Sequence, residues 1–132
     1  MKKIIIMILT MSIVLSLAGC GGETSNMEIV EWTPSETYTD EEIKDAIDVV
    51  CDDIRHFRGV KLKTITYAGD DVSEEYMDWA TKYECDQTLV LVSTVKTSAI
   101  VSSFEKNKTY EDFKWILIRK DDSNWSHVAH EY

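Results

Sequence analysis

The stretch TDEEIKDAIDVVCDDIRHFRG, residues 39 to 59, carries the strongest fold signal in the sequence. Thr39 and Glu42 have the spacing of a capping box, in which each side chain accepts a hydrogen bond from the backbone N–H of the other residue. Apolar residues then recur at intervals of three and four, as on one face of a helix. These residues are Ile43, Ala46, Ile47, Val50, Cys51, Ile54 and Phe57. Because Gly59 is placed to stop the helix, the stretch predicts one amphipathic helix lying on a flat surface.

The segments after this helix predict a sheet. Residues 60 to 67 are rich in β-branched side chains, and residues 88 to 95 contain the run LVLV, which suits a strand buried on both faces. Residues 113 to 120 predict a strong strand. The turn DDSN at 121 to 124 then leads into a return strand over residues 125 to 132, so the chain closes with a hairpin.

The order of these segments predicts the α+β fold class. We expect a long amphipathic N-terminal helix packed on a curved antiparallel sheet of about four strands, with a short second helix over residues 73 to 83. Residues 96 to 111 are polar and fit either a ragged strand end or a long loop. Residues 39 to 132 are enough for one hydrophobic core, so a single domain is expected there.

The first twenty residues have the layout of an export signal. Lys2 and Lys3 precede an apolar run of 14 residues, 4 to 17, and the tetrapeptide LAGC at 17 to 20 ends it. The run is shorter than the ~20 residues that a membrane-spanning helix needs. A positive start, an apolar run and small residues before a polar segment are typical of a secretory signal peptide. We therefore interpret residues 1 to 19 as a signal peptide that is removed.

The tetrapeptide resembles the lipobox of bacterial lipoproteins, and this resemblance implies that Cys20 is lipidated. In that family the cysteine thiol receives a diacylglyceryl group, and cleavage makes the cysteine the new N-terminus. Two acyl chains hold a protein stably at a membrane. Residues 20 to 38 are rich in small and polar side chains and are expected to form a flexible linker. The sequence thus predicts a protein held at the extracellular face of the cell membrane through lipid on Cys20.

The charge balance argues against two classes of partner. Lys2 and Lys3 leave with the signal peptide and no acidic residue does, so residues 20 to 132 carry 12 basic and 24 acidic side chains, a net charge of −12. Nucleic acid phosphates and anionic lipid head groups repel such a surface. No nucleic acid partner is therefore expected. Solubility beside a membrane explains the charge, and cationic ligands are the alternative.

A second resemblance covers residues 39 to 132. The capped helix, the motifs LVLVS (89 to 93) and FKWILIRKDDSNW (113 to 125), and the closing HEY resemble a family of small uncharacterised lipoproteins from Gram-positive bacteria. The resemblance implies a cystatin-like or nuclear transport factor two-like domain, in which a curved antiparallel sheet cradles a long helix. The shared motifs mark strands and core, not a catalytic site.

The side chains that could carry chemistry give weak spacing signals. Cys51 and Cys85 could form a disulfide outside the cytoplasm, but Cys51 also fits the apolar helix face as a buried thiol. His127 and His130 lie three residues apart on an expected strand, which places them on opposite faces and excludes a shared metal ion. The sequence contains no nucleophile motif, phosphate loop or dinucleotide fingerprint. Catalytic residues, a metal and a cofactor are therefore not expected.

Aromatic residues gather where the helix is expected to meet the sheet. A filled core explains most of them, but Tyr67, Trp79 and Trp115 could also line a pocket between the two layers. The sequence favours a non-catalytic binding or interaction module for an unknown small molecule or protein. A small cell-surface hydrolase that uses a pocket His, Cys or carboxylate is the alternative, and contact between Cys85 and a histidine would favour it.

Overall fold

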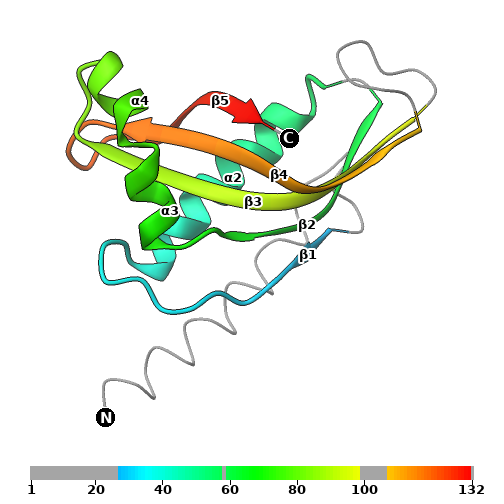
Figure 1. The fold of residues 1–132 in the computed structure, drawn as a ribbon, viewed down its shortest axis with the longest axis horizontal. Helices are drawn as coiled ribbons and strands as arrows, with labels where there is room; N and C mark the ends of the chain where they lie inside the picture. Colours follow the sequence, from blue (N-terminus) through cyan, green and yellow to red (C-terminus); the bar gives the residue numbers. More distant parts are fainter. Residues whose placement is uncertain (1–26, 58, 99–106, 132) are drawn as a thin grey trace.

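The computed structural model describes residues 27–57, 59–98 and 107–131, which form helices on both faces of a five-stranded sheet (Figure 1). In chain order the elements are β1 (Glu28–Ile29), α2 (Asp40–Ile54), β2 (Val60–Tyr67), α3 (Asp70–Glu75), α4 (Met77–Lys82), β3 (Gln87–Thr97), β4 (Thr109–Arg119) and β5 (Ser126–Glu131). Part of the polar segment 96 to 111 thus extends β3 and begins β4, while residues 99–106 lie outside the described ranges.

Helix α2 begins as its sequence predicts. The Thr39 Oγ1 atom accepts the Glu42 N–H at 3.1 Å, and Glu42 Oε1 accepts the Thr39 N–H at 2.9 Å, so the capping box is confirmed. Six positions of the predicted apolar face are buried, namely Ile43, Ala46, Ile47, Val50, Cys51 and Ile54. The helix ends at Ile54, before the predicted stop at Gly59. The φ of +80° at Gly59 instead serves the turn into β2.

The sheet has the strand order β1-β2-β3-β4-β5 and is mixed. Strand β1 runs parallel to β2, whereas the three other neighbouring pairs are antiparallel. Strands β3 and β4, with 11 residues each, form its centre. Each antiparallel pair contains a register shift. Such β-bulges bend a strand and redirect its side chains, and the bulge between β4 and β5 determines the candidate site.

The predicted fold class is wrong. The sheet has five strands and is not fully antiparallel, and α2 is a helix of 15 residues that lies between β1 and β2. It is therefore not a long N-terminal helix. The expected second helix is divided into α3 and α4, which meet at Tyr76. The structure thus differs from the cystatin-like arrangement that the sequence predicts.

The parallel strand β1 explains most of this error. Strand β1 pairs with β2 through Glu28 and Ile29, and the Val30 N–H donates to the Ile65 carbonyl at 3.0 Å. Ile29 is buried in the core, and Met27 and Trp32 pack against the same core as partly buried side chains. A pairing of two residues is too short to produce a periodic pattern. For this reason the sequence reading placed β1 inside a linker.

The sheet is covered on both faces (Figure 1). Helix α2 packs on one face, which we call the inner face, and α3 and α4 lie on the outer face. The main core cluster lies on the inner face and includes Leu91 and Trp115. Val90, Ile116 and Ile118 alternate with inner residues and are buried outside that cluster. These three side chains therefore belong to the outer face, under α3 and α4.

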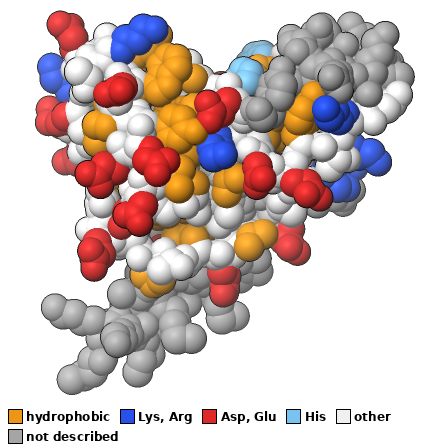
Figure 2. Space-filling view, in the orientation of Figure 1, with side chains coloured by type: hydrophobic (Ala, Val, Ile, Leu, Met, Phe, Trp, Pro, Cys, Tyr) orange, Lys and Arg blue, Asp and Glu red, His pale blue; other side chains and the backbone are white. Residues whose placement is uncertain are grey.

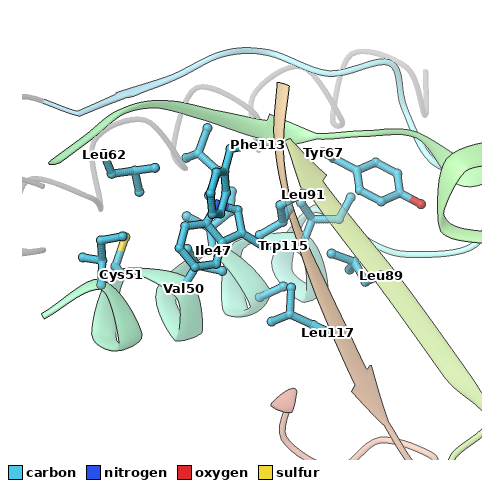
Figure 3. Close-up of a cluster of buried hydrophobic side chains, with 14 of the residues drawn as sticks. Ile47, Val50, Cys51, Leu62, Tyr67, Leu89, Leu91, Phe113, Trp115 and Leu117 are labelled. Carbon is cyan, nitrogen blue, oxygen red and sulfur yellow. The ribbon is translucent and has the colours of Figure 1, made fainter. Parts of the chain in front are cut away.

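Large side chains fill the space between α2 and the inner face (Figure 3). Phe113 and Trp115 are fully buried, with ring centroids 4.9 Å apart. The Trp115 indole N–H donates to Ser93 Oγ at 2.8 Å, and that hydroxyl donates to the Phe113 carbonyl at 3.0 Å. The buried indole therefore has the polar partner that a tryptophan core position requires.

Arg119 connects the end of β4 to the start of α2. Its guanidinium forms an ion pair with Glu42 and lies over the Trp125 ring, 4.2 Å from the ring centroid. The Trp125 indole N–H donates to the Glu42 carbonyl at 3.1 Å. Burial raises the pKa of Glu42, but hydrogen bonds from Thr39 and Arg119 outweigh burial and lower the pKa overall. The helix start is thus fixed to the sheet through one carboxylate.

Candidate functional site

Two histidines of β5 lie together at the edge of the inner face. Strand β5 bulges at Val128, because His127 and Ala129 pair with consecutive residues of β4. The extra residue interrupts the alternation of side chains between the two faces. As a result, the rings of His127 and His130 lie on the same face, with centroids 5.5 Å apart.

The predicted placement of these histidines on opposite faces is therefore wrong. The prediction assumed regular alternation along the strand, and the segment SHVAHE has no glycine or proline that would mark a bulge. The centroid of the Trp115 ring lies 5.1 Å from that of His127 and 5.7 Å from that of His130. One core tryptophan thus packs against both imidazoles.

Asp53, near the end of α2, orients His127. The Asp53 Oδ2 atom lies 3.0 Å from His127 Nδ1. The His127 side chain is only 9% exposed, while that of Asp53 is 38% exposed. The other ring nitrogen, Nε2, is buried and has no hydrogen-bond partner among the described residues. When Nδ1 carries the proton donated to Asp53, Nε2 carries a lone pair. In this neutral tautomer, the site holds a buried acceptor nitrogen without a donor among the described residues.

Aromatic rings surround the two imidazoles. Phe57 and Phe113 lie beside His130, with centroid distances of 5.4 and 5.5 Å. Burial against these rings, and to a smaller extent the neighbouring His127, lowers the pKa of His130. A lowered pKa favours the neutral imidazole at neutral pH, which is the form that accepts hydrogen bonds or binds a metal ion. We call Asp53, His127 and His130 the histidine site.

Cys51 and Cys85 are not part of this site. Cys51 is buried on α2, with its Sγ atom 4.0 Å from Met27 Sδ. Cys85 lies between α4 and β3, and its Sγ atom is 3.7 Å from the Tyr83 carbonyl oxygen. No disulfide joins Cys51 to Cys85 in the structure. Neither thiol is therefore placed as a nucleophile beside His127.

The aromatic residues expected to line a pocket do not share one. Trp115 is fully buried in the inner core, and Tyr67 is buried at the end of β2. Trp79 lies on α4 over the outer face. Its ring stacks on the Tyr83 ring, with centroids 6.5 Å apart, and Lys82 Nζ lies 5.0 Å from the Trp79 ring centroid. Figure 2 shows apolar side chains gathered where α4 and β3 lie, with acidic side chains around them. The sheet separates Trp79 from Trp115.

A second polar cluster, which the sequence reading missed, surrounds Asp70. Its Oδ1 atom accepts the Ser35 hydroxyl at 2.5 Å and the Tyr67 hydroxyl at 2.6 Å. The Val90 N–H donates to Ser73 Oγ, which donates to the Tyr67 hydroxyl. A shallow cavity of about 270 Å³ lies next to it, lined by residues 34 to 40. These hydrogen bonds connect the segment before α2 with β2, α3 and β3. We therefore interpret the cluster as part of the framework of the fold and not as a binding site.

Within the described ranges, no group of three or more His, Cys, Asp or Glu side chains is arranged to hold a metal ion. The histidine site offers two imidazoles, which leaves other coordination positions of an ion to water or to a ligand. It is also the place where a buried nitrogen lacks a partner. The histidine site is therefore the strongest candidate for binding chemistry in this part of the chain.

Comparison with protein-family models, curated proteins and solved structures found no match. The resemblance to a lipoprotein family thus stays a prediction from the sequence motifs. The predicted lipidation residue Cys20 lies outside the described residues. In the ranges that are described, no helix combines the length and apolar character needed to cross a bilayer.

Proposed function

We propose that this chain is a lipoprotein held by lipid on Cys20 at the extracellular face of the cell membrane, and that its domain is a non-catalytic binding module. The observation that carries the anchor is the order of segments in residues 1 to 20. A positive start, an apolar run of 14 residues and the tetrapeptide Leu-Ala-Gly-Cys follow one another there. A diacylated cysteine gives stable attachment without a spanning helix.

The histidine site supports a binding role for the domain. Asp53 fixes the His127 ring, and the Nε2 atom is left as an acceptor for an incoming group. A hydrolytic histidine also needs a nucleophile at the nitrogen that the carboxylate does not hold. No described hydroxyl or thiol forms a hydrogen bond with Nε2. This arrangement favours binding over turnover.

A small cell-surface hydrolase is the second candidate, and the Asp53–His127 hydrogen bond favours it. A carboxylate orients the imidazole in the same way in many hydrolytic sites. Water activated by Nε2 would then be the nucleophile. Turnover of generic ester, peptide, glycoside or phosphate substrates that disappears in a folded His127→Gln variant would support this candidate and contradict the non-catalytic proposal.

Metabolic labelling with a palmitate analogue tests the anchor. We expect the wild-type chain to be labelled and found in the membrane fraction, because the acyl chains are added at Cys20. The Cys20→Ala variant should lose the label and accumulate as precursor or leave the membrane. Cys85→Ala is the matched control and should label like the wild type. Equal labelling of the Cys20→Ala variant would contradict the proposal.

A further inference from the structure

We infer that the histidine site binds a divalent d-block metal ion such as Cu²⁺, with His127 and His130 as ligands and Asp53 as a positioning residue. The inference names a ligand class for the proposed binding module and rests on that role of the domain. It does not depend on the anchor at Cys20.

The hydrogen bond to Asp53 is the first reason. A histidine that ligates a metal almost always donates its other ring N–H to a carboxylate, carbonyl or water, which fixes the tautomer and the ring orientation. Asp53 Oδ2 holds this relation to His127 Nδ1 at 3.0 Å. The nitrogen left for a ligand is then Nε2.

The state of Nε2 is the second reason. This atom is buried, and no donor among the described residues satisfies it. A buried polar atom without a partner destabilises a fold, because it has lost its hydrogen bonds to water. With Nδ1–H directed at Asp53, Nε2 requires an electron-pair acceptor, and a cation supplies one. The buried nitrogen without a partner is thus a second observation that points to a ligand, and the Asp53 contact identifies this nitrogen as the acceptor.

The spacing of the rings is the third reason. A divalent d-block ion lies about 2.0–2.1 Å from each imidazole nitrogen, so two neighbouring ring centres lie about 4.5 Å apart on a square-planar ion such as Cu²⁺ and about 5 Å apart on a tetrahedral one. The centroids of His127 and His130 are 5.5 Å apart, and their planes are inclined by 37°. The two rings are therefore near enough to share one ion after a small adjustment of the partly exposed His130.

The donor atoms determine the class of metal. Calcium and magnesium prefer oxygen ligands, whereas imidazole suits Zn²⁺, Ni²⁺ and Cu²⁺. Cu²⁺ forms the tightest complexes with such ligands in this series, so it is the best probe. Because the described residues supply two imidazoles and no third ligand, the ion would keep positions open for water or a further ligand.

Aromatic packing alone is the competing explanation. The His127 ring meets Trp115 at 62°, so a protonated Nε2 could direct its N–H at the indole. In that case the imidazoles would be ordinary members of the aromatic cluster. The two explanations differ in whether the loss of His130 changes metal affinity, because His130 is not needed for the contact between His127 and Trp115.

The experiment titrates the full chain, purified in detergent, with Cu²⁺ in the presence of excess Mg²⁺, which occupies the acidic surface. We expect one saturable site, quenching of tryptophan fluorescence because Trp115 packs on His127, and imidazole nitrogen couplings in the electron paramagnetic resonance spectrum. His130→Gln should weaken Cu²⁺ binding by at least about tenfold. Removing a residue that only hydrogen-bonds to a ligand already lowers metal affinity by about this factor, so removing a ligand should lower it at least as much.

Two further variants complete the test. His56→Gln removes the remaining histidine, which is exposed in the turn after α2, and should bind Cu²⁺ like the wild type. Asp53→Ala should weaken binding by about tenfold while the nitrogen couplings persist, since Asp53 orients a ligand and is not one.

His130 is exposed, so His130→Gln remains testable even where the buried His127→Gln does not fold. Absence of saturable binding, or equal affinity in His130→Gln and the wild type, would overturn the inference. Either result leaves the palmitate labelling of Cys20 unaffected.

Discussion

Asp70 shows how much of this fold depends on single polar side chains. Its carboxylate accepts hydrogen bonds from Ser35, Tyr67 and the Glu36 N–H, so it joins the segment before α2 to the end of β2. Burial raises the pKa of Asp70, but hydrogen bonds from Ser35, Tyr67 and the backbone outweigh burial and lower the pKa overall. The ionised form is therefore the one that the folded state prefers.

This preference predicts that Asp70→Asn lowers the free energy of unfolding by an amount that depends on pH. A carboxyl with a lowered folded-state pKa stabilises the fold fully above its unfolded-state pKa, and the stabilisation is lost as the pH falls through the folded-state value. At pH 7 we expect the variant to be less stable than the wild type by about 1–3 kcal/mol, since hydrogen bonds to a charged group are lost. The difference should shrink as the wild-type carboxylate is protonated. Chemical denaturation at pH 7 and at pH 3 measures both values.

Asp71→Asn is the matched control for this prediction. Asp71 is exposed beside Asp70 in the first turn of α3, so its replacement should change stability by less than about 0.5 kcal/mol at either pH. A stability difference between Asp70→Asn and wild type that is equally large at pH 7 and pH 3 would argue against a role for the charge.

At the scale of elements, the capping box determines where α2 begins. Removal of the Thr39 hydroxyl in Thr39→Ala should destabilise the domain by about 0.5–2 kcal/mol, because the Glu42 N–H loses its partner at the helix start. A domain of this size loses roughly 4–8 °C in melting temperature per kcal/mol. Thermal unfolding followed by circular dichroism measures the shift.

Thr37→Ala makes the same substitution two residues earlier, at an exposed position outside the box. It should alter stability by less than about 0.5 kcal/mol. Equal melting temperatures for the two variants would mean that the capping box does not stabilise α2 in solution.

Strand β5 contains a bulge that its own residue pattern does not predict. The register shift at Val128 comes from how β5 pairs with β4 and leaves no mark in the residues of β5 themselves. Regular alternation along β5 predicts that the two histidines lie on opposite faces of the sheet. The site therefore depends on a pairing between strands that sequence reasoning did not detect.

At the scale of the whole molecule, the inner face of the sheet carries most of the core. Ile47 is fully buried between α2 and the sheet. Ile47→Ala should therefore destabilise the domain by about 2–5 kcal/mol, through lost apolar burial and the cavity that remains. Urea denaturation followed by tryptophan fluorescence is suitable, because Trp115 reports on the same core.

The control for Ile47→Ala is Asp45→Ala, two residues away on the exposed face of the same helix. Its effect should stay within about 0.5 kcal/mol. Comparable losses in both variants would show that the apolar face of α2 was assigned incorrectly.

The sequence by itself determined the local elements of this protein. The capping box, the buried face of α2 and the bounds of β2 at residues 60 and 67 follow from neighbouring residues, and the structure confirms them. Capping and periodicity act within a few residues, so their signals are visible in one stretch of chain. The predictions for residues 1 to 20 rest on the same kind of local signal.

Tertiary structure alone decided the mixed sheet and the histidine site. The two paired residues of β1 are held by β2, and α3 and α4 both contact β3 on the outer face. Asp53 and His127 are separated by 74 positions in the chain, and the bulge in β5 brings His130 to the same face. Such contacts form because distant segments share one core, and the spacing of residues along the chain does not encode which segments will meet.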